Sequence, residues 1–367
     1  MITNLSDIDT PAVLIEKSVM ENNVRLMQAL SDRCRVNLRV HVKTHKIPAL
    51  AKLQLKAGAI GIAVAKLGEA EVMAAAGIKD IQIANIIVGE SKFRRLARLS
   101  RTCRLSIAID SEENAKELSI VLSRSRRSVN VFIKVDTGLR RCGLAAFPRI
   151  LQLVERAQKL KGVKIVGLLT HAGHAYGARN RKQVQDIGQA EGEVVVRFAR
   201  RLTRLGFQIP VVSVGSTPTA PYCAAVDGVT ELRVGNYIFN DMTQVALGTV
   251  GLNRCALGVL ATVISIPTPD RAVIDAGSKA LGTDRGAHGR DILAGFGHIV
   301  GGGGELTRLS EEHGVIERLT RPFKIGQKVR VIPNHACTVM NLFDSAYLVD
   351  GEAVIERNPV AARGRTS

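Results

Sequence analysis

The amino-acid sequence predicts an α/β protein that combines a (β/α)8 barrel of the TIM type with a second, mainly β domain. Between residues 38 and 234, eight short apolar runs alternate with segments whose apolar residues recur at helical spacing. Eight such units in about 200 residues favour a closed barrel over an open sheet. After residue 252, strand-like runs and glycine-rich connections replace the helical pattern. We therefore expect the barrel over residues 18–250 and the β domain over residues 1–17 and 251–367.

The predicted barrel elements follow one another regularly. Ser18 and Glu21 have the spacing of a capping box, which predicts that a helix begins there. Pro48 and Pro148 each suit the first turn of a helix, and Gly77 suits a helix end. The expected barrel strands are residues 38–43, 60–64, 81–86, 105–110, 129–136, 163–169, 211–214 and 231–234.

The remaining strand-like runs are expected to form the β domain. They are residues 256–266, 271–274, 328–332, and the pair 345–349 and 353–356 around an Asp-Gly turn. The early run 12–16 (AVLIE) precedes the first barrel strand, so we expect it to join this second sheet. Residues 301–304 are four glycines without the lysine-serine ending of a phosphate-binding loop, which favours a flexible turn.

Composition excludes several classes of protein. Of 367 residues, 46% are hydrophobic and 4% aromatic, and the six cysteines show no pairing rhythm, so we expect free thiols and a cytoplasmic location. We find neither a membrane-spanning apolar stretch nor a secretory leader pattern. The formal charge of +18 is concentrated in the expected outer helices. Few aromatic residues are present to stack on bases, so solvated helix faces or attraction of small anions explain this charge better than nucleic acid does.

Lys43 lies where the first barrel strand is expected to end, in the sequence HVKTHK. In a barrel the chemistry gathers at the carboxyl ends of the strands. Lysine forms imines with carbonyl compounds, which makes this amine a candidate nucleophile. The alternative is a strand that ends in a solvated basic turn. Other polar residues expected at strand ends are Asn85, Asp110, Asp136, Arg141, His171, Ser216, Gly235 and Asn236.

Two glycine-containing turns follow the seventh and eighth strands. The first contains Ser216 and Thr217 in GSTPT, and the second contains Gly235 and Asn236. Glycine lets backbone amides approach an anion, and hydroxyl groups add donors, so the two turns could bind a phosphate. Together with a lysine on the first strand, they suggest pyridoxal 5'-phosphate as cofactor.

Two further motifs follow the fifth and sixth strands. Arg141, in DTGLRRCG, could place a guanidinium beside the pyridine nitrogen of such a cofactor, and the alternative is a surface arginine. HAGHAYG groups His171, His174 and Tyr176 in a glycine-rich setting, where Tyr176 could bond the phosphate or the Lys43 region. We therefore include His171 and Tyr176 among the candidates for cofactor binding.

His335 and Cys337 follow a strand of the β domain in PNHAC. Residues i and i+2 of an extended chain project on the same side, so this pair could share one ion. Imidazole with thiolate favours Zn2+, and two protein ligands leave positions for water and substrate. The ordinary alternative is a buried histidine beside a core cysteine.

The motifs taken together resemble the D-serine dehydratase and D-threonine aldolase group of alanine-racemase-fold (fold type III) pyridoxal phosphate enzymes. They are HVKTHK, DTGLRRCG, LLTHAGHAYG, VSVGSTPT, ELRVGNYIF, EEHG and IPNHAC, and they span nearly the whole chain. The resemblance implies that Lys43 carries the cofactor as an imine and that Arg141 faces the pyridine nitrogen. It further implies cofactor binding by Tyr176, Thr217, Gly235 and Asn236, a metal held by His335 and Cys337, and a homodimer.

The resemblance also narrows the activity. We expect a pyridoxal phosphate- and zinc-dependent lyase that dehydrates a 3-hydroxy-D-amino acid of the D-serine, D-threonine or D-threo-3-hydroxyaspartate type; Mn2+ or another divalent cation is the alternative metal. The second hypothesis is a D-threonine aldolase, a branch that typically has histidine and aspartate ligands. An amino acid racemase and a non-catalytic pyridoxal phosphate carrier are less favoured. Leu169 stands where some D-serine dehydratases have an aromatic residue, which points away from simple D-serine specificity.

Overall fold

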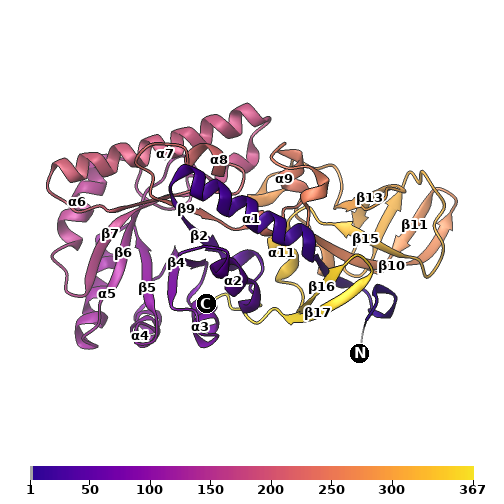
Figure 1. Cartoon of the computed structure of the whole chain (residues 1–367), viewed down its shortest axis with the longest axis horizontal. Coiled ribbons are helices and arrows are strands. Elements are labelled where there is room, and N and C mark those ends of the chain that lie inside the picture. The colour runs from indigo at the N-terminus through magenta and orange to yellow at the C-terminus, as the bar shows by residue number, and fades with distance from the viewer. Residues whose placement is uncertain (1–2) are drawn as a thin grey trace.

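The computed structural model describes residues 3–367 and contains the predicted closed barrel. Eight parallel strands pair in sequence order, and β2 closes the ring by pairing with β9 (Figure 1). This confirms the predicted fold. The strands are β2 (Asn37–His41), β3 (Gly61–Val64), β4 (Asp80–Ile86), β5 (Arg104–Ile109), β6 (Val129–Lys134), β7 (Val163–Leu169), β8 (Val211–Val214) and β9 (Glu231–Val234).

Helices on the outside of the barrel connect these strands (Figure 1). Pro48 and Pro148 lie in the first turns of their helices, as expected. Ser111 caps the helix that follows it. The helices of this region are α1 (Lys17–Cys34), α2 (Pro48–Lys56), α3 (Leu67–Ala75), α4 (Glu90–Leu99), α5 (Glu112–Arg124), α6 (Phe147–Ala157), α7 (Arg181–Arg204), α8 (Ala220–Cys223) and α9 (Met242–Ala246).

Two local predictions are wrong. Ser18 does not begin a capping box, because strand β1 (Ala12–Glu16) runs directly into α1 and leaves Ser18 inside the helix. The first barrel strand also ends earlier than expected. It stops at His41, and Lys43 lies in the 3₁₀ turn η2 (Val42–Thr44) that follows. This turn, rather than the strand itself, directs the lysine side chain.

A nine-stranded sheet forms the second part of the molecule (Figure 1). As predicted, β1 belongs to it, since it pairs with β10 in antiparallel and with β16 in parallel orientation. The sequence patterns did not reveal β12, β13 and β14, which have two, five and four residues. The sheet contains β1, β10 (Leu257–Thr268), β11 (Arg271–Ile274), β12 (His298–Ile299), β13 (Glu305–Leu309), β14 (Gly314–Glu317), β15 (Lys328–Ile332), β16 (Ser345–Asp350) and β17 (Ala353–Pro359). Two short helices, α10 (Ser278–Leu281) and α11 (Ala336–Met340), accompany it.

The barrel and the second sheet share one hydrophobic core and are joined by backbone hydrogen bonds. The amides of Met242 and Thr243 donate to the carbonyls of Pro333 and Asn334, 3.1 and 3.2 Å away. These contacts hold the start of α11 against the end of the barrel where β9 terminates. No helix within residues 3–367 is long and apolar enough to cross a membrane.

Candidate active site

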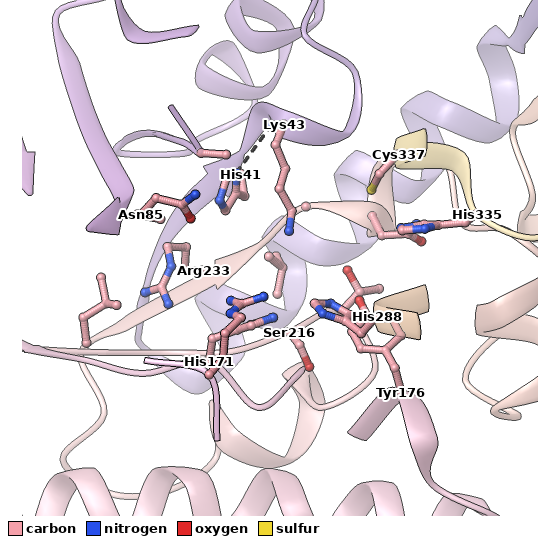
Figure 2. Close-up of a pocket in the computed structure, with 18 of the residues that line it drawn as sticks. His41, Lys43, Asn85, His171, Tyr176, Ser216, Arg233, His288, His335 and Cys337 are labelled. Atoms are coloured by element: carbon pink, nitrogen blue, oxygen red, sulfur yellow. Dashed lines mark hydrogen bonds between the residues drawn. The ribbon is translucent and has the colours of Figure 1, made fainter. Parts of the chain in front are cut away.

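A cavity of about 260 Å³ lies at the carboxyl ends of the barrel strands, where α11 of the second sheet region covers the barrel (Figure 2). All ten candidate residues from the sequence line it. They are Lys43, Arg141, His171, Tyr176, Ser216, Thr217, Gly235, Asn236, His335 and Cys337. The other lining residues are His41, Ala65, Ala84, Asn85, Lys134, Leu169, Arg233, Val234 and His288.

Within the HVKTHK motif, the amine that faces the cavity is that of Lys43 (Figure 2). Its backbone amide donates to Nδ1 of His41, 3.4 Å away, which fixes the turn η2. Lys46, the other lysine of this motif, has a different environment. Its Nζ contacts Glu69 Oε1 at 3.1 Å and Asn341 Oδ1 at 2.7 Å, and it does not line the cavity. Of the two lysines, only Lys43 is therefore placed to react with a bound carbonyl compound.

The two glycine-containing turns lie side by side in the cavity wall. Gly235 must lack a side chain, because a Cβ there would lie 2.7 Å from the His41 carbonyl oxygen. Oγ1 of Thr217 accepts a hydrogen bond from the Tyr237 amide at 3.1 Å, which ties the first turn to the second. The amide group of Asn236 donates to Asp241 at 2.6 Å, while its Oδ1 atom is buried without a partner among residues 3–367. Polar groups in this wall thus remain available for a ligand.

The cavity has a strongly cationic lining. Lys43, Lys134, Arg141 and Arg233 contribute formal positive charges, and no lining residue is a carboxylate. Burial lowers the pKa of both Lys134 and Arg233. Such a lining favours an anionic ligand. Sequence reasoning missed Lys134 and Arg233, although their positions in predicted strands beside motif residues could have identified them.

His171 is held as a neutral imidazole with one free nitrogen. Its Nδ1 lies 3.0 Å from the Gly215 carbonyl oxygen, which can only accept, so Nδ1 carries the proton. Burial and the nearby Lys43 place the pKa of His171 well below its usual range. The Nε2 atom is buried without a partner in the described part of the chain. It therefore presents a lone pair at the cavity wall.

His288 reaches the cavity from the second sheet region. It lies in the turn η6 (Ala287–Gly289) with a left-handed backbone, φ 59°. Its ring is 4.7 Å from the Tyr176 ring and 5.4 Å from the His171 ring, measured between centroids (Figure 2). Burial and Lys43 lower the pKa of His288 to about 3, so it is neutral at pH 7. No sequence signal indicated this residue, because its segment matches no helix or strand pattern.

His335 and Cys337 lie next to each other opposite Lys43, but not in the predicted conformation (Figure 2). His335 caps α11 and Cys337 lies in the first turn of that helix, so the chain is not extended over both residues. The Cys337 sulfur is 3.3 Å from Thr44 Oγ1, the residue after Lys43. The imidazole Nδ1 of His335 is 2.7 Å from Asp284 Oδ2.

The two side chains of this pair stabilise each other's charged forms. Burial opposes ionisation of Cys337, yet His335 and Lys43 lower the pKa of the thiol. Burial alone would lower the pKa of His335, but Cys337 and Asp284 raise it to about 10. The thiolate is thus favoured, and the thiolate is the form of cysteine that binds metals. Within residues 3–367 no group of three or more histidine, cysteine or acidic side chains could hold a metal ion, so these two would be its protein ligands.

Several polar residues of the predicted motifs have structural positions instead. Asp110 accepts from the Gly143 amide at 2.9 Å, and Asp136 accepts from the Gly138 amide at 2.9 Å. Both carboxylates therefore fix loop backbone and do not line the cavity. His174 also lies outside it, against Gly138. The EEHG motif forms the exposed turn between β13 and β14.

Two families match consecutive parts of this chain. The family described as alanine racemase, N-terminal domain, matches residues 15–242, which include the end of β1 and the whole barrel. A serine dehydratase domain matches residues 256–349, which include His335 and Cys337.

Two curated relatives are similar over nearly their whole length. The chain is 35% identical over 353 residues to the D-threo-3-hydroxyaspartate dehydratase of Delftia sp. strain HT23, covering 92% of this chain and 93% of that enzyme. It is 33% identical over 370 residues to the D-threonine aldolase of an Arthrobacter species, covering 98% and 94%.

Solved structures agree with these similarities. The D-threonine aldolase from Filomicrobium marinum matches with a TM-score of 0.93 and 27% identity over 100% of both chains. The Delftia dehydratase matches with a TM-score of 0.91 and 33% identity over 98% of this chain and 99% of that one. Two further similar structures are of D-threo-3-hydroxyaspartate dehydratase with single mutations. One has a histidine mutated, and the other, in the metal-free form, has a cysteine mutated two positions later.

Proposed function

The chain belongs to the family described as alanine racemase, N-terminal domain, and from this membership we propose that it is a lyase acting on a 3-hydroxy-D-amino acid with pyridoxal 5'-phosphate and a divalent cation. The favoured reaction is dehydration to a 2-keto acid and ammonia. The observation that carries this proposal is the single cavity lined by the Lys43 amine on one side and by the His335 and Cys337 pair on the other.

The residues of the cavity fit the cofactor. Four cations and no carboxylate line it, which suits a phosphate group. Ser216, Thr217, Gly235 and Asn236 would hold the phosphate. Asn236 Oδ1 and His171 Nε2 are buried acceptors without partners in residues 3–367, and they could accept from a donor group of the ligand. Arg141, His171 and Tyr176 would contact the rest of the cofactor. When bound, pyridoxal phosphate supplies an electron sink for the bond-breaking step.

The pair on α11 fits a borderline-soft cation such as Zn2+, with Mn2+ as the alternative. The histidine and cysteine mutated in the two D-threo-3-hydroxyaspartate dehydratase structures have the same spacing as His335 and Cys337. A cation held there would act as a Lewis acid on the β-hydroxyl group, which is otherwise a poor leaving group.

Each residue then has a definite task. Lys43 would attach the cofactor and, once displaced by the substrate amine, accept the α-proton at Nζ. His335 and Cys337 would hold the cation at the β-hydroxyl side. The neutral rings of His288 and Tyr176 pack together at the wall and limit the water that reaches the reacting atoms.

The second candidate is an aldolase that cleaves the Cα–Cβ bond to give glycine and an aldehyde. It is supported by the D-threonine aldolases of Arthrobacter and Filomicrobium marinum among the similar proteins. In this case the same cation would favour loss of the hydroxyl proton instead of loss of hydroxide.

Product analysis distinguishes the two reactions. The purified protein, loaded with pyridoxal phosphate and Zn2+, is incubated with D-serine, D-threonine and the isomers of 3-hydroxyaspartate. Ammonia with a keto acid is the expected result, and glycine with an aldehyde supports the second candidate. The absence of both product pairs from every substrate would overturn both.

The organisation of the molecule is part of the proposal. We take residues 18–250 as the cofactor-binding domain, and residues 1–17 and 251–367 as the domain that holds the metal. All six cysteines are free, which suits a reducing, cytoplasmic location. We further propose a homodimer, which light scattering of the purified protein tests.

A further inference from the structure

Asp284 is held in a fixed orientation beside His335. It belongs to the loop of residues 282–292, which follows α10. Its Oδ2 atom is 2.7 Å from His335 Nδ1 and accepts from Thr338 Oγ1 at 2.6 Å. Its main-chain oxygen accepts from Asn334 Nδ2 at 2.9 Å. Contacts to both side chain and backbone therefore fix the carboxylate against the imidazole.

This contact determines which nitrogen of His335 can bind a cation. Oδ2 of the Asp284 carboxylate accepts from Thr338 Oγ1 and lies 2.7 Å from His335 Nδ1, so Nδ1 is the nitrogen whose proton faces the carboxylate. Nε2 is therefore the nitrogen left to bind a cation. Cys337 lies beside the ring (Figure 2). A carboxylate that fixes a metal-binding histidine in this way also makes the ring a better ligand.

A second acidic residue of the same loop, Asp291, does not share the contact that Asp284 makes with His335. Asp291 pairs with Arg285, 3.2 Å away, and both are exposed. It contacts neither His335 nor Cys337. Asp291 is therefore a matched control for Asp284, since it has the same charge in the same segment.

We propose that Asp284 is a positioning residue for the metal site, which acts by fixing the tautomer and orientation of His335. This inference rests on the proposed binding of a cation by His335 and Cys337. It adds a third residue, 51 positions away from His335 along the chain, on which the affinity for the cation depends.

The test measures the Kd for Zn2+. The protein carries bound pyridoxal phosphate, and a chelator has removed its metal. It is then titrated with Zn2+ in competition with a chromogenic chelator. Asp284→Ala is expected to raise the Kd for Zn2+ about 10- to 100-fold. Asp284→Asn is expected to raise it less, because the amide oxygen still accepts from Nδ1. Asp291→Asn is expected to leave the Kd unchanged. The visible absorbance of the bound cofactor, measured in each variant, reports that the barrel side is intact.

The outcomes separate the two levels of the proposal. If the wild type binds one Zn2+ and Asp284→Ala binds it with the same Kd, the role of Asp284 is overturned and the metal site remains in place. No Zn2+ bound by the wild type would overturn the metal site and the inference together. If Asp284→Ala does not fold, the Kd of the isosteric Asp284→Asn decides: a value equal to that of the wild type and of Asp291→Asn overturns the inference, and a raised value supports it.

Discussion

The two walls of the cavity place their functional side chains in different ways. On the barrel wall, Lys43, His171 and Asn236 lie directly after strands β2, β7 and β9. On the opposite wall, His288 and His335 come from a loop and from the cap of the short helix α11. The barrel wall carries cations and suits a phosphorylated cofactor, whereas the opposite wall carries a thiol with an imidazole and suits a metal. The difference indicates that attachment of the cofactor and activation of the hydroxyl group can be removed separately.

The largest effect is expected from Lys43→Ala. Loss of the amine removes both the attachment of the cofactor and the proton acceptor, so activity should fall at least about 1,000-fold. Borohydride reduction followed by peptide mass mapping should find the cofactor on Lys43 in the wild type and in Lys46→Met. Label on Lys46, whose amine contacts Glu69, would contradict this assignment.

The next largest effect is expected on the opposite wall. His335→Ala and Cys337→Ala should each lose bound metal and reduce lyase activity about 100-fold or more, since Lewis-acid assistance contributes several kcal/mol. The visible absorbance of the attached cofactor should persist. Elemental analysis and absorbance of the same samples check both statements. Loss of the cofactor together with the metal would show that the two walls do not function separately.

Glu191 provides a test of the barrel wall by pH. Its carboxylate accepts from the amides of Ala172 and Gly215, which follow β7 and β8. Burial raises the pKa of Glu191 to about 7, above the value of about 4.5 in the unfolded chain. The folded state therefore binds the proton more tightly than the unfolded chain does. The contribution of protonated Glu191 to the free energy of unfolding is fully present below pH 4.5 and is lost as the pH rises through 7.

In urea unfolding, the free energy of unfolding of the wild type should fall relative to that of Glu191→Gln between pH 4.5 and 8, by about 2 to 3 kcal/mol. Gln cannot titrate, so the variant provides the reference. A difference between the two proteins that stays constant over this range would contradict the raised pKa.

The smallest effect is expected from His288→Ala. Packing between rings such as those of His288 and Tyr176 contributes about 0.5–1.5 kcal/mol, so kcat/KM should fall about 2- to 10-fold while bound metal and cofactor remain. His313→Ala, in the exposed turn between β13 and β14, is the control. Equal kinetics in the two variants would show that His288 only fills space at the wall.

The sequence predicted the barrel wall better than the opposite wall, for physical reasons. Parallel strands bring their carboxyl ends to one edge, so Lys43, Ser216 and Gly235 could be grouped without coordinates. The sequence also predicted that His335 and Cys337 lie side by side, and they do, but the chain enters α11 instead of remaining extended as expected.

Other parts of the site had no local signal. His288 depends on a left-handed backbone in a segment where Gly286 and Gly289 also have positive φ, and no helix or strand period describes such a segment. Asp284 contacts His335 from a loop 51 positions earlier in the chain. Contacts of this kind arise from tertiary structure and not from residue spacing.

The most direct test is a crystal structure of the holoenzyme with anomalous diffraction measured at the zinc edge. We predict density that continues from Lys43 Nζ into the cofactor, and an anomalous peak bonded to His335 Nε2 and Cys337 Sγ in the same cavity. A cofactor attached to another lysine, or a metal peak away from this pair, would contradict the account.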